Sequence, residues 1–203
     1  FPTETVYGAG VDATNPAAVQ KLLAYKSRRE GKPLSIAVAD QAMAEEYVEL
    51  NDSARRLYHR FLPGPLTVVS RDLGRVAPGV ASEYGTLGVR IPAYPLITEL
   101  VRQLGRPITA TSANASGGRR PYQVSDFWSQ LSGTQQSLVD LILDAGPLPA
   151  NPPSTVVDTT VATPVTFRQG QLQIDQAQSV TTASYQTRTE SETQAVAQRL
   201  LLQ

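Results

Sequence analysis

The sequence predicts an α/β domain, and three observations carry that prediction. From residue 1 to about residue 170, short apolar runs of strand length alternate with stretches of helical periodicity. The 203 residues, 41% of them hydrophobic, suffice for one domain with a buried core but not for two large domains. Residues 171–203 are rich in Gln, Thr and Ser, so we expect a domain over residues 1–172 and a polar tail over residues 173–203 that ends in a short helix.

The expected elements have recognisable start and stop signals. Asn15 is placed to cap the first helix, whose first residue is Pro16, and Gly105 is placed to end the helix that precedes it. The predicted helices span residues 16–26, 40–50, 51–62, 95–104 and 126–131. The predicted strands span residues 35–39, 66–70, 87–91, 108–111, 138–143, 154–158 and 165–170.

The composition excludes several classes of function. Eighteen Lys and Arg residues balance 18 Asp and Glu residues, so the chain has no global field for non-specific nucleic-acid or membrane binding, and any anion site must be local. The absence of Cys excludes thiol nucleophiles and Cys/His zinc sites, and His59 is the only imidazole for a Ser-His-Asp arrangement. Without a membrane-length apolar run or a leader, we expect a cytoplasmic protein with no membrane contact.

A basic segment provides the first candidate for an anion site. Lys26 lies seven residues after Val19, so it continues the apolar stripe of the first helix and points inward or to a rim. The alternative is a cation that stabilises the C-terminus of that helix. The segment 21–32 holds five basic residues and one acid, and it either binds phosphate or forms a solvated loop.

The loop over residues 111–118, TSANASGG, provides the second candidate. Hydroxyls, an amide and two glycines follow a predicted strand there, which suits phosphate oxygens, although a plain turn is the competing interpretation. Gly8, Gly10 and Ala13 match G-x-G-x-x-A. Because no convincing buried strand precedes them, we do not expect a dinucleotide-binding domain.

Hydroxyls and arginines in extended segments provide the third candidate. Thr3 and Thr5 are two residues apart, so their hydroxyls face the same side and suit an amino acid or a phosphate. Arg90 and Arg168 lie within predicted strands, where each guanidinium needs an anionic partner. That partner is either a bound anion or the carboxylate of a structural salt bridge.

The motifs FPTETVYGAG, KSRREGKPL, LPGPLTVV, LGVRIPAYP, PITATSANASG, STVVD and FRQG together resemble, in order and spacing, the threonylcarbamoyl-AMP synthase family in its short, single-domain form. The resemblance covers residues 1–172. It implies the YrdC-like fold, a twisted, mostly mixed or parallel sheet with helices around a large concave cavity. It also implies synthesis of L-threonylcarbamoyladenylate from L-threonine, bicarbonate and ATP with release of pyrophosphate, for the tRNA modification t6A37.

The resemblance also implies the site. It assigns ATP binding to Lys26, Arg28, Ser112, Asn114 and Arg168, with Lys26 and Arg28 as the catalytic pair, and threonine binding to Thr3, Arg90 and Thr155. Mg²⁺ is expected on the phosphates of ATP rather than on a protein metal site. The chain departs from the family pattern at Arg29, usually proline, at Ala37, often histidine, and in lacking the strand before PTET, so we expect that an N-terminal segment has been lost.

Partners and rival functions follow from the same resemblance. The implied partner is a downstream tRNA threonylcarbamoyl transferase complex, with at most a weak RNA contact. One rival is the carbamoyl-adenylate-forming domain of carbamoyltransferases, which usually occurs in large chains with Cys-rich zinc modules. The other rival is a double-stranded RNA-binding module, which the zero net charge disfavours.

Overall fold

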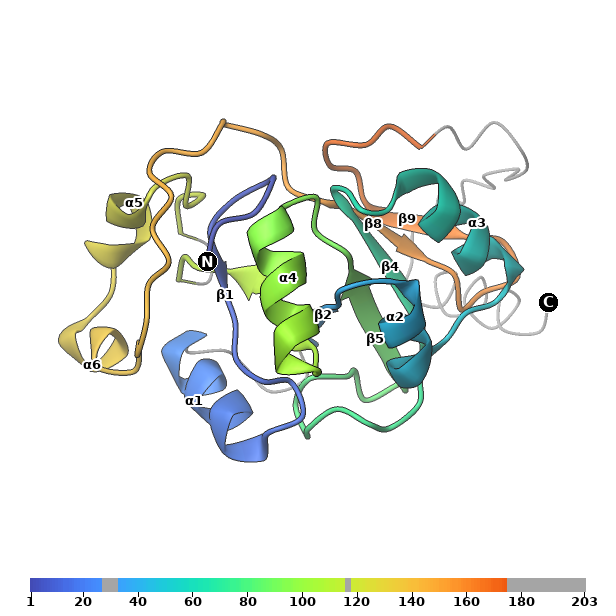
Figure 1. Ribbon diagram of the computed structural model, residues 1–203, viewed down its shortest axis with the longest axis horizontal. Helices are drawn as coiled ribbons and strands as arrows, with labels where there is room; N and C mark the ends of the chain where they lie inside the picture. The colour runs from blue at the N-terminus through green and yellow to red at the C-terminus, as the bar shows by residue number, and fades with distance from the viewer. Residues whose placement is uncertain (27–32, 116–117, 175–203) are drawn as a thin grey trace, which may run out of the picture. The chain divides into compact units, whose positions relative to one another are not determined.

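A mixed β-sheet forms the centre of the fold, and helices surround it (Figure 1). The computed structural model describes residues 1–26, 33–115 and 118–174, and Phe1–Gln173 form one compact unit. The strands of the sheet are β2 (Ser35–Ala37), β3 (Val48–Glu49), β4 (Leu66–Asp72), β5 (Thr86–Arg90), β6 (Ile108–Thr109), β8 (Thr155–Asp158) and β9 (Val165–Arg168). Their order is β6-β2-β5-β4-β8-β9, and β3 pairs with β4.

The pairing of the strands confirms the mixed α/β class. β2 runs parallel to β5, and β4 runs parallel to β8, whereas the other pairs in the sheet are antiparallel. Two further strands, β1 (Gly8–Ala9) and β7 (Thr111–Ser112), form a separate antiparallel pair. This pair fixes the N-terminal segment against the start of the loop over residues 111–118.

The pleat of the sheet separates an apolar face from a polar one. Ile36 pairs with Val89, Val89 with Val68, and Val68 with Val157, and all four side chains are buried. At the preceding positions of β4 and β8, Thr67 pairs with Val156, and Val156 pairs with Arg168. These three side chains lie on the opposite face of the sheet. Because side chains alternate along a strand, the residue next to each buried β-branched residue in the sequence points to the other face.

The first five helices of the described residues begin within two residues of the predicted starts, and the sixth was not predicted. They are α1 (Pro16–Lys26), α2 (Gln41–Tyr47), α3 (Asp52–Phe61), α4 (Pro95–Leu104), α5 (Val124–Trp128) and α6 (Gly133–Gln136). The side chain of Asn15 accepts hydrogen bonds from the backbone N–H groups of Ala17 and Ala18, as an N-cap does. Gly105 ends α4 with a φ of 68°, a left-handed conformation that favours glycine.

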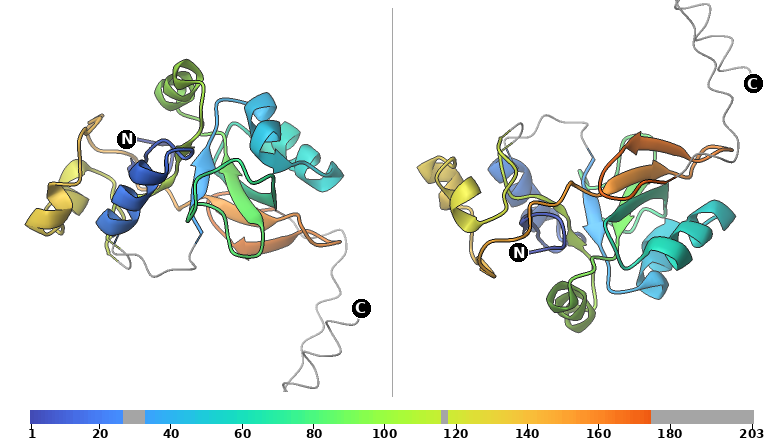
Figure 2. Two further views of the ribbon diagram at one scale, coloured as in Figure 1. Left: turned by 90° about the horizontal axis from the view of Figure 1, so that it is seen from below. Right: turned by 90° about the horizontal axis from the view of Figure 1, so that it is seen from above.

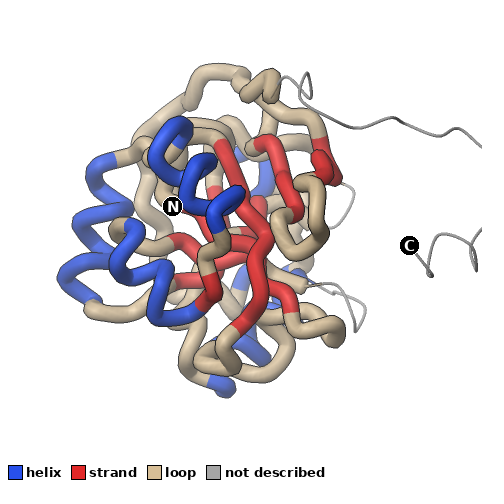
Figure 3. Tube along the Cα trace, turned by 90° about the vertical axis from the view of Figure 1, so that its right-hand side faces the viewer, coloured by secondary structure: helices blue, strands red, loops and turns tan. Residues whose placement is uncertain are grey.

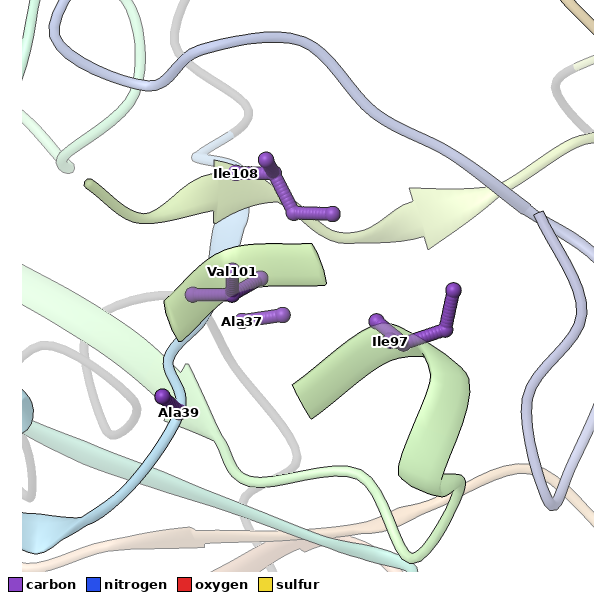
Figure 4. Packing of buried hydrophobic residues seen from close by; sticks show 5 residues of the cluster. All are labelled: Ala37, Ala39, Ile97, Val101 and Ile108. Carbon is purple, nitrogen blue, oxygen red and sulfur yellow. The ribbon is translucent and has the colours of Figure 1, made fainter. Parts of the chain in front are cut away.

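The helices occupy different sides of the sheet. Figure 2 shows α1 beside α5 and α6 at one end of the sheet and α2 and α3 at the other, and Figure 3 shows the strands gathered between helices. α4 packs its buried Ile97 and Val101 against Ala37, Ala39 and Ile108 (Figure 4). This apolar cluster holds α4 against the β2–β6 edge.

Several predicted elements are wrong in extent or in kind, among them the strand predicted over residues 108–111, which is divided between β6 and β7. The helix predicted over residues 40–50 ends at Tyr47, because Val48 and Glu49 pair with β4 instead. The helix predicted over residues 126–131 is α5, which starts and ends earlier. The strand predicted over residues 138–143 does not form: this apolar segment has no ladder partner and runs as irregular chain.

Candidate active site

A cavity of about 620 Å³ opens on the polar face of the sheet. Its floor includes Ser35, Thr67, Arg90, Val156 and Arg168, which come from five different strands. Its walls come from the N-terminal segment, the end of α1 and the chain on both sides of residues 116–117. A volume of this size is typical of a small-molecule or cofactor site.

Arg90 reaches the cavity through the pleat of β5 and carries an ion pair. Its Nη2 lies 2.6 Å from Oε1 of Glu4, and their side chains are only 11% and 14% exposed. Nε of Arg90 and Oε2 of Glu4 are buried, and neither has a hydrogen-bond partner within the described residues. Arg90 therefore fits both expected partners: it forms a structural salt bridge with Glu4, and it also borders a cavity that is able to receive an anion.

Arg168 lies at the other end of the floor. It donates from Nε to the carbonyl of Ser154 and from Nη2 to the hydroxyl of Ser154, each at 3.0 Å. That hydroxyl also lies 3.0 Å from the hydroxyl of Thr67. Partial burial lowers the pKa of the Arg168 guanidinium, and the charges of Arg90 and Arg120 lower it further.

Lys26 is the last residue of α1 and is almost fully buried. Its Nζ donates to the carbonyl of Ser112 at 2.6 Å and to the carbonyl of Asn114. The hydroxyl of the preceding residue, Tyr25, donates to the carbonyl of Ala113. The end of α1 thus holds three consecutive carbonyls of the loop, so Lys26 contacts a segment far from it in the sequence.

Ser112 and Asn114 line the cavity beside Lys26. The Asn114 side chain donates to the carbonyl of Gly118 at 2.7 Å, across residues 116–117. Its Oδ1 is buried and has no hydrogen-bond partner among the residues that the structure describes. An unsatisfied buried acceptor next to a cavity is a group that a ligand donor would complete.

The hydroxyls of Thr3 and Thr5 lie together, although residues 4–6 form a bend rather than the extended segment that was expected. Their hydroxyl oxygens are 3.1 Å apart, and both residues line the cavity. Oγ1 of Thr3 also donates to the carbonyl of Val6 at 2.6 Å and accepts from the N–H groups of Thr5 and Val6. The Thr3 hydroxyl therefore shapes the turn that forms this wall of the cavity.

Thr155 is not placed at the cavity. Its hydroxyl donates to the carbonyl of Leu172 at 2.7 Å and accepts from the N–H of Gly170. Ser154 and Val156, the residues on either side, line the cavity instead. The alternation of side chains along β8 explains this difference from the expected threonine contact.

The remaining candidates divide into those outside the cavity and those outside the described residues. Arg28, Arg29 and the predicted tail helix fall among residues 27–32 and 175–203, which the structure does not describe. His59 is exposed on α3. A Cβ on Gly10 would lie 2.7 Å from the carbonyl oxygen of Thr109, so close backbone packing explains this glycine.

Sequence reasoning missed three residues of the site. Glu4 lies inside the PTET motif, and Arg90 was known to need an anionic partner, but nothing in the sequence joins the two. Ser154 follows from the alternation along β8 once the pairing of that strand is known. Arg120, directly after the loop, lines the cavity and was not singled out.

The charges that line the cavity favour an anion. Lys26, Arg90, Arg120 and Arg168 line it, whereas none of the described lining residues is Asp or Glu. A concave, partly desolvated site with one sign of charge attracts ligands of the opposite sign. None of the helices within residues 1–26, 33–115 and 118–174 has the length and apolar character of a membrane span.

Comparison with known proteins places this arrangement in a family. A family model described as telomere recombination, for the Sua5, YciO and YrdC proteins, matches residues 1–170. The chain belongs to the Sua5/YciO/YrdC family. A family protein of Methanocaldococcus jannaschii is 36% identical over 172 residues, which are 85% of this chain and 79% of that protein. The threonylcarbamoyl-AMP synthase of Bacillus subtilis is 35% identical, over 89% of this chain and 51% of that protein.

Solved structures of the Sua5/YciO/YrdC family share the fold. Sua5 of Pyrococcus abyssi, complexed with L-threonine, superposes with a TM-score of 0.77 at 34% identity, over 84% of this chain and 49% of that one. YciO of Escherichia coli superposes with a TM-score of 0.73 at 26% identity, over 84% and 81%. The chain thus spans about half the length of the Bacillus and Pyrococcus proteins and most of YciO.

Proposed function

We propose that this chain joins L-threonine, bicarbonate and ATP to form L-threonylcarbamoyladenylate, releasing pyrophosphate and water. The observation that carries the proposal is the cationic cavity of about 620 Å³ that Lys26, Ser112 and Asn114 line in a member of this family. Relatives such as the Bacillus subtilis protein bear the name of this activity. A related Pyrococcus abyssi structure contains L-threonine.

The chemistry requires placement and charge more than a protein nucleophile. The amine nitrogen of threonine forms a bond to the carbon of bicarbonate, a C–O bond of bicarbonate breaks, and water leaves. An oxygen of the resulting carbamate then attacks the α-phosphorus of ATP, and the bond to the leaving pyrophosphate breaks. No residue of the protein is covalently modified in this sequence. Positioning two bound reactants and stabilising the charge that moves onto the leaving group supply the rate enhancement.

The site residues take the following roles in this proposal. Lys26 and Arg28 act on the reacting phosphates, Ser112 and Asn114 bind oxygens and N–H groups of the nucleotide, and Arg168 contributes further positive charge. Arg90 binds the carboxylate of threonine next to Thr3. Thr155 acts indirectly, because its hydroxyl bonds to Gly170 and Leu172 and thereby fixes the start of β8, directly after Ser154.

Mg²⁺ enters the proposal with the nucleotide. Magnesium prefers carboxylate, phosphate and water oxygens. The described lining of the cavity has no carboxylate, and the described residues contain no cluster of three or more His, Cys, Asp or Glu side chains that would hold a metal. These residues do not fit a protein-held ion, so we assign the ion to the phosphates of ATP and to water.

Release of pyrophosphate from ATP tests the proposal. We expect release that requires both L-threonine and bicarbonate, and a product that a downstream tRNA threonylcarbamoyl transferase complex consumes. Serine should support much slower release than threonine. Equal release with serine, or with no amino acid, would contradict the assignment of threonine as the substrate.

A further inference from the structure

Arg120 lines the cavity but belongs to none of the motifs behind the proposed function. It shares this position with Arg90 and Arg168, and its charge is among the causes that lower the Arg168 pKa. Its neighbour in the chain, Arg119, is also exposed but does not line the cavity. The two adjacent arginines thus differ in position while their chemistry is the same.

The three cavity arginines also differ in how far the protein already uses them. Arg90 is neutralised in part by Glu4, at 2.6 Å. Arg168 already donates hydrogen bonds from Nε and Nη2 to Ser154. Within the described residues Arg120 forms no ion pair and no hydrogen bond. Its whole planar set of N–H donors is therefore available to a ligand.

We propose that Arg120 binds the terminal phosphates of ATP and, after transfer, the pyrophosphate that leaves. This inference rests on the proposed function and adds one residue to it. Pyrophosphate carries several negative charges and many acceptor oxygens, so it needs more than one cation, and a guanidinium fork matches phosphate oxygens in pairs. Arg120 supplies positive charge to the same cavity as Arg168, and no carboxylate of the described cavity lining neutralises it.

The test compares Arg120→Ala with the matched control Arg119→Ala. Calorimetric titration with inorganic pyrophosphate at fixed ionic strength measures the contact without requiring catalysis. Loss of a charge-assisted contact should weaken pyrophosphate binding roughly 10-fold or more in Arg120→Ala. Arg119→Ala should weaken it by less than about twofold, because a solvated charge outside the cavity is screened. Arg120→Lys, which keeps the charge but not the fork, should fall between wild type and Arg120→Ala.

Kinetics give a second readout. In Arg120→Ala the Michaelis constant for ATP should rise while that for threonine stays unchanged. Equal effects of the two alanine variants, or a change in the threonine constant alone, would overturn the assignment of Arg120 to the phosphates. Pyrophosphate binding that depends on Arg120, in a wild-type protein that forms no adenylate from threonine, would support the contact and contradict the proposed function.

Discussion

Arg90 combines two tasks that the sequence presents as alternatives. Its guanidinium neutralises the partly buried Glu4, whose side chain is 14% exposed, and also borders the cavity. Breaking a buried ion pair by removing one partner leaves an uncompensated charge, which typically costs about 3–5 kcal/mol. The role in stability and the role in binding must therefore be separated by a second substitution.

We predict that Arg90→Ala lowers the free energy of unfolding by roughly 3 kcal/mol and raises the Michaelis constant for threonine. Adding Glu4→Gln removes the stranded carboxylate, so the double variant should regain much of the stability but not the threonine affinity. Urea denaturation and threonine kinetics measure the two effects. A double variant that is as unstable as Arg90→Ala would show that the ion pair is not the source of the loss.

Lys26 likewise has a structural and a chemical task. It donates to two carbonyls of the loop, each of which costs about 1–3 kcal/mol when left buried and unsatisfied. We predict that Lys26→Met lowers the melting temperature and raises the Michaelis constant for ATP about 10-fold or more.

Lys21 provides the control on the same helix. It pairs with Asp140, whose side chain is 79% exposed, and exposed pairs contribute little. Lys21→Met should leave the ATP constant near the wild-type value. If the two lysine variants lost ATP affinity equally, the contact of Lys26 with the nucleotide would be wrong.

At the scale of elements, local signals predicted where helices start better than they predicted which segments pair with one another in the sheet. Asn15 caps α1, Asp40 caps α2, and Gly105 ends α4, because each cap is a local hydrogen bond or a local backbone conformation. Val48 and Glu49 are not helical as predicted, because they form backbone hydrogen bonds with strand β4. Such a bond joins residues distant in the sequence, so a local pattern does not contain it.

The segment over residues 138–143 failed for a related reason. Its apolar run is typical of a strand. The residues that follow it, 144–151, are held by hydrogen bonds that involve side chains and not by the backbone hydrogen bonds of a sheet. The Tyr7 hydroxyl donates to Asp144 and to the carbonyl of Gly146, and the Asn151 side chain donates to the carbonyl of Glu4. Those anchors are contacts between distant parts of the chain, which periodicity does not reveal.

The contact between the end of α1 and the loop predicts a pH effect. Burial raises the pKa of Tyr25 to about 12, above its ordinary value of 10.0. The folded state therefore holds this proton more tightly, so the stabilisation is complete below pH 10.0 and is lost as the pH rises toward about 12.

We predict that Tyr25→Phe, which cannot ionise, is less stable than wild type at pH 8 but loses less stability at higher pH. Urea denaturation from pH 8 upward measures the difference. The control Tyr84→Phe, at a side chain that is 84% exposed, should show the same fall as wild type. An unchanged fall in Tyr25→Phe would contradict the burial of this hydroxyl against Ala113.

At the scale of the whole molecule, a chain with zero net charge concentrates cations in one cavity. The sequence predicted the α/β class and many of the residues that line this cavity, because ordered motifs at the ends of strands converge in such folds. It did not predict Arg120 or the pairing of Glu4 with Arg90, and it assigned Thr155 rather than Ser154 to the cavity. Those details depend on the register and pleat of strands that pair across long stretches of chain.

The proposed reaction joins three small molecules into one adenylate in the cavity. Incubating the protein with ¹⁴C-bicarbonate, L-threonine and ATP, and then separating the nucleotides, follows the carbon directly. We predict a labelled product whose mass equals threonine, one carbonyl and AMP combined, formed only when all three substrates are present. Label that remains in bicarbonate while ATP is consumed, or a labelled nucleotide that forms without threonine, would contradict the account.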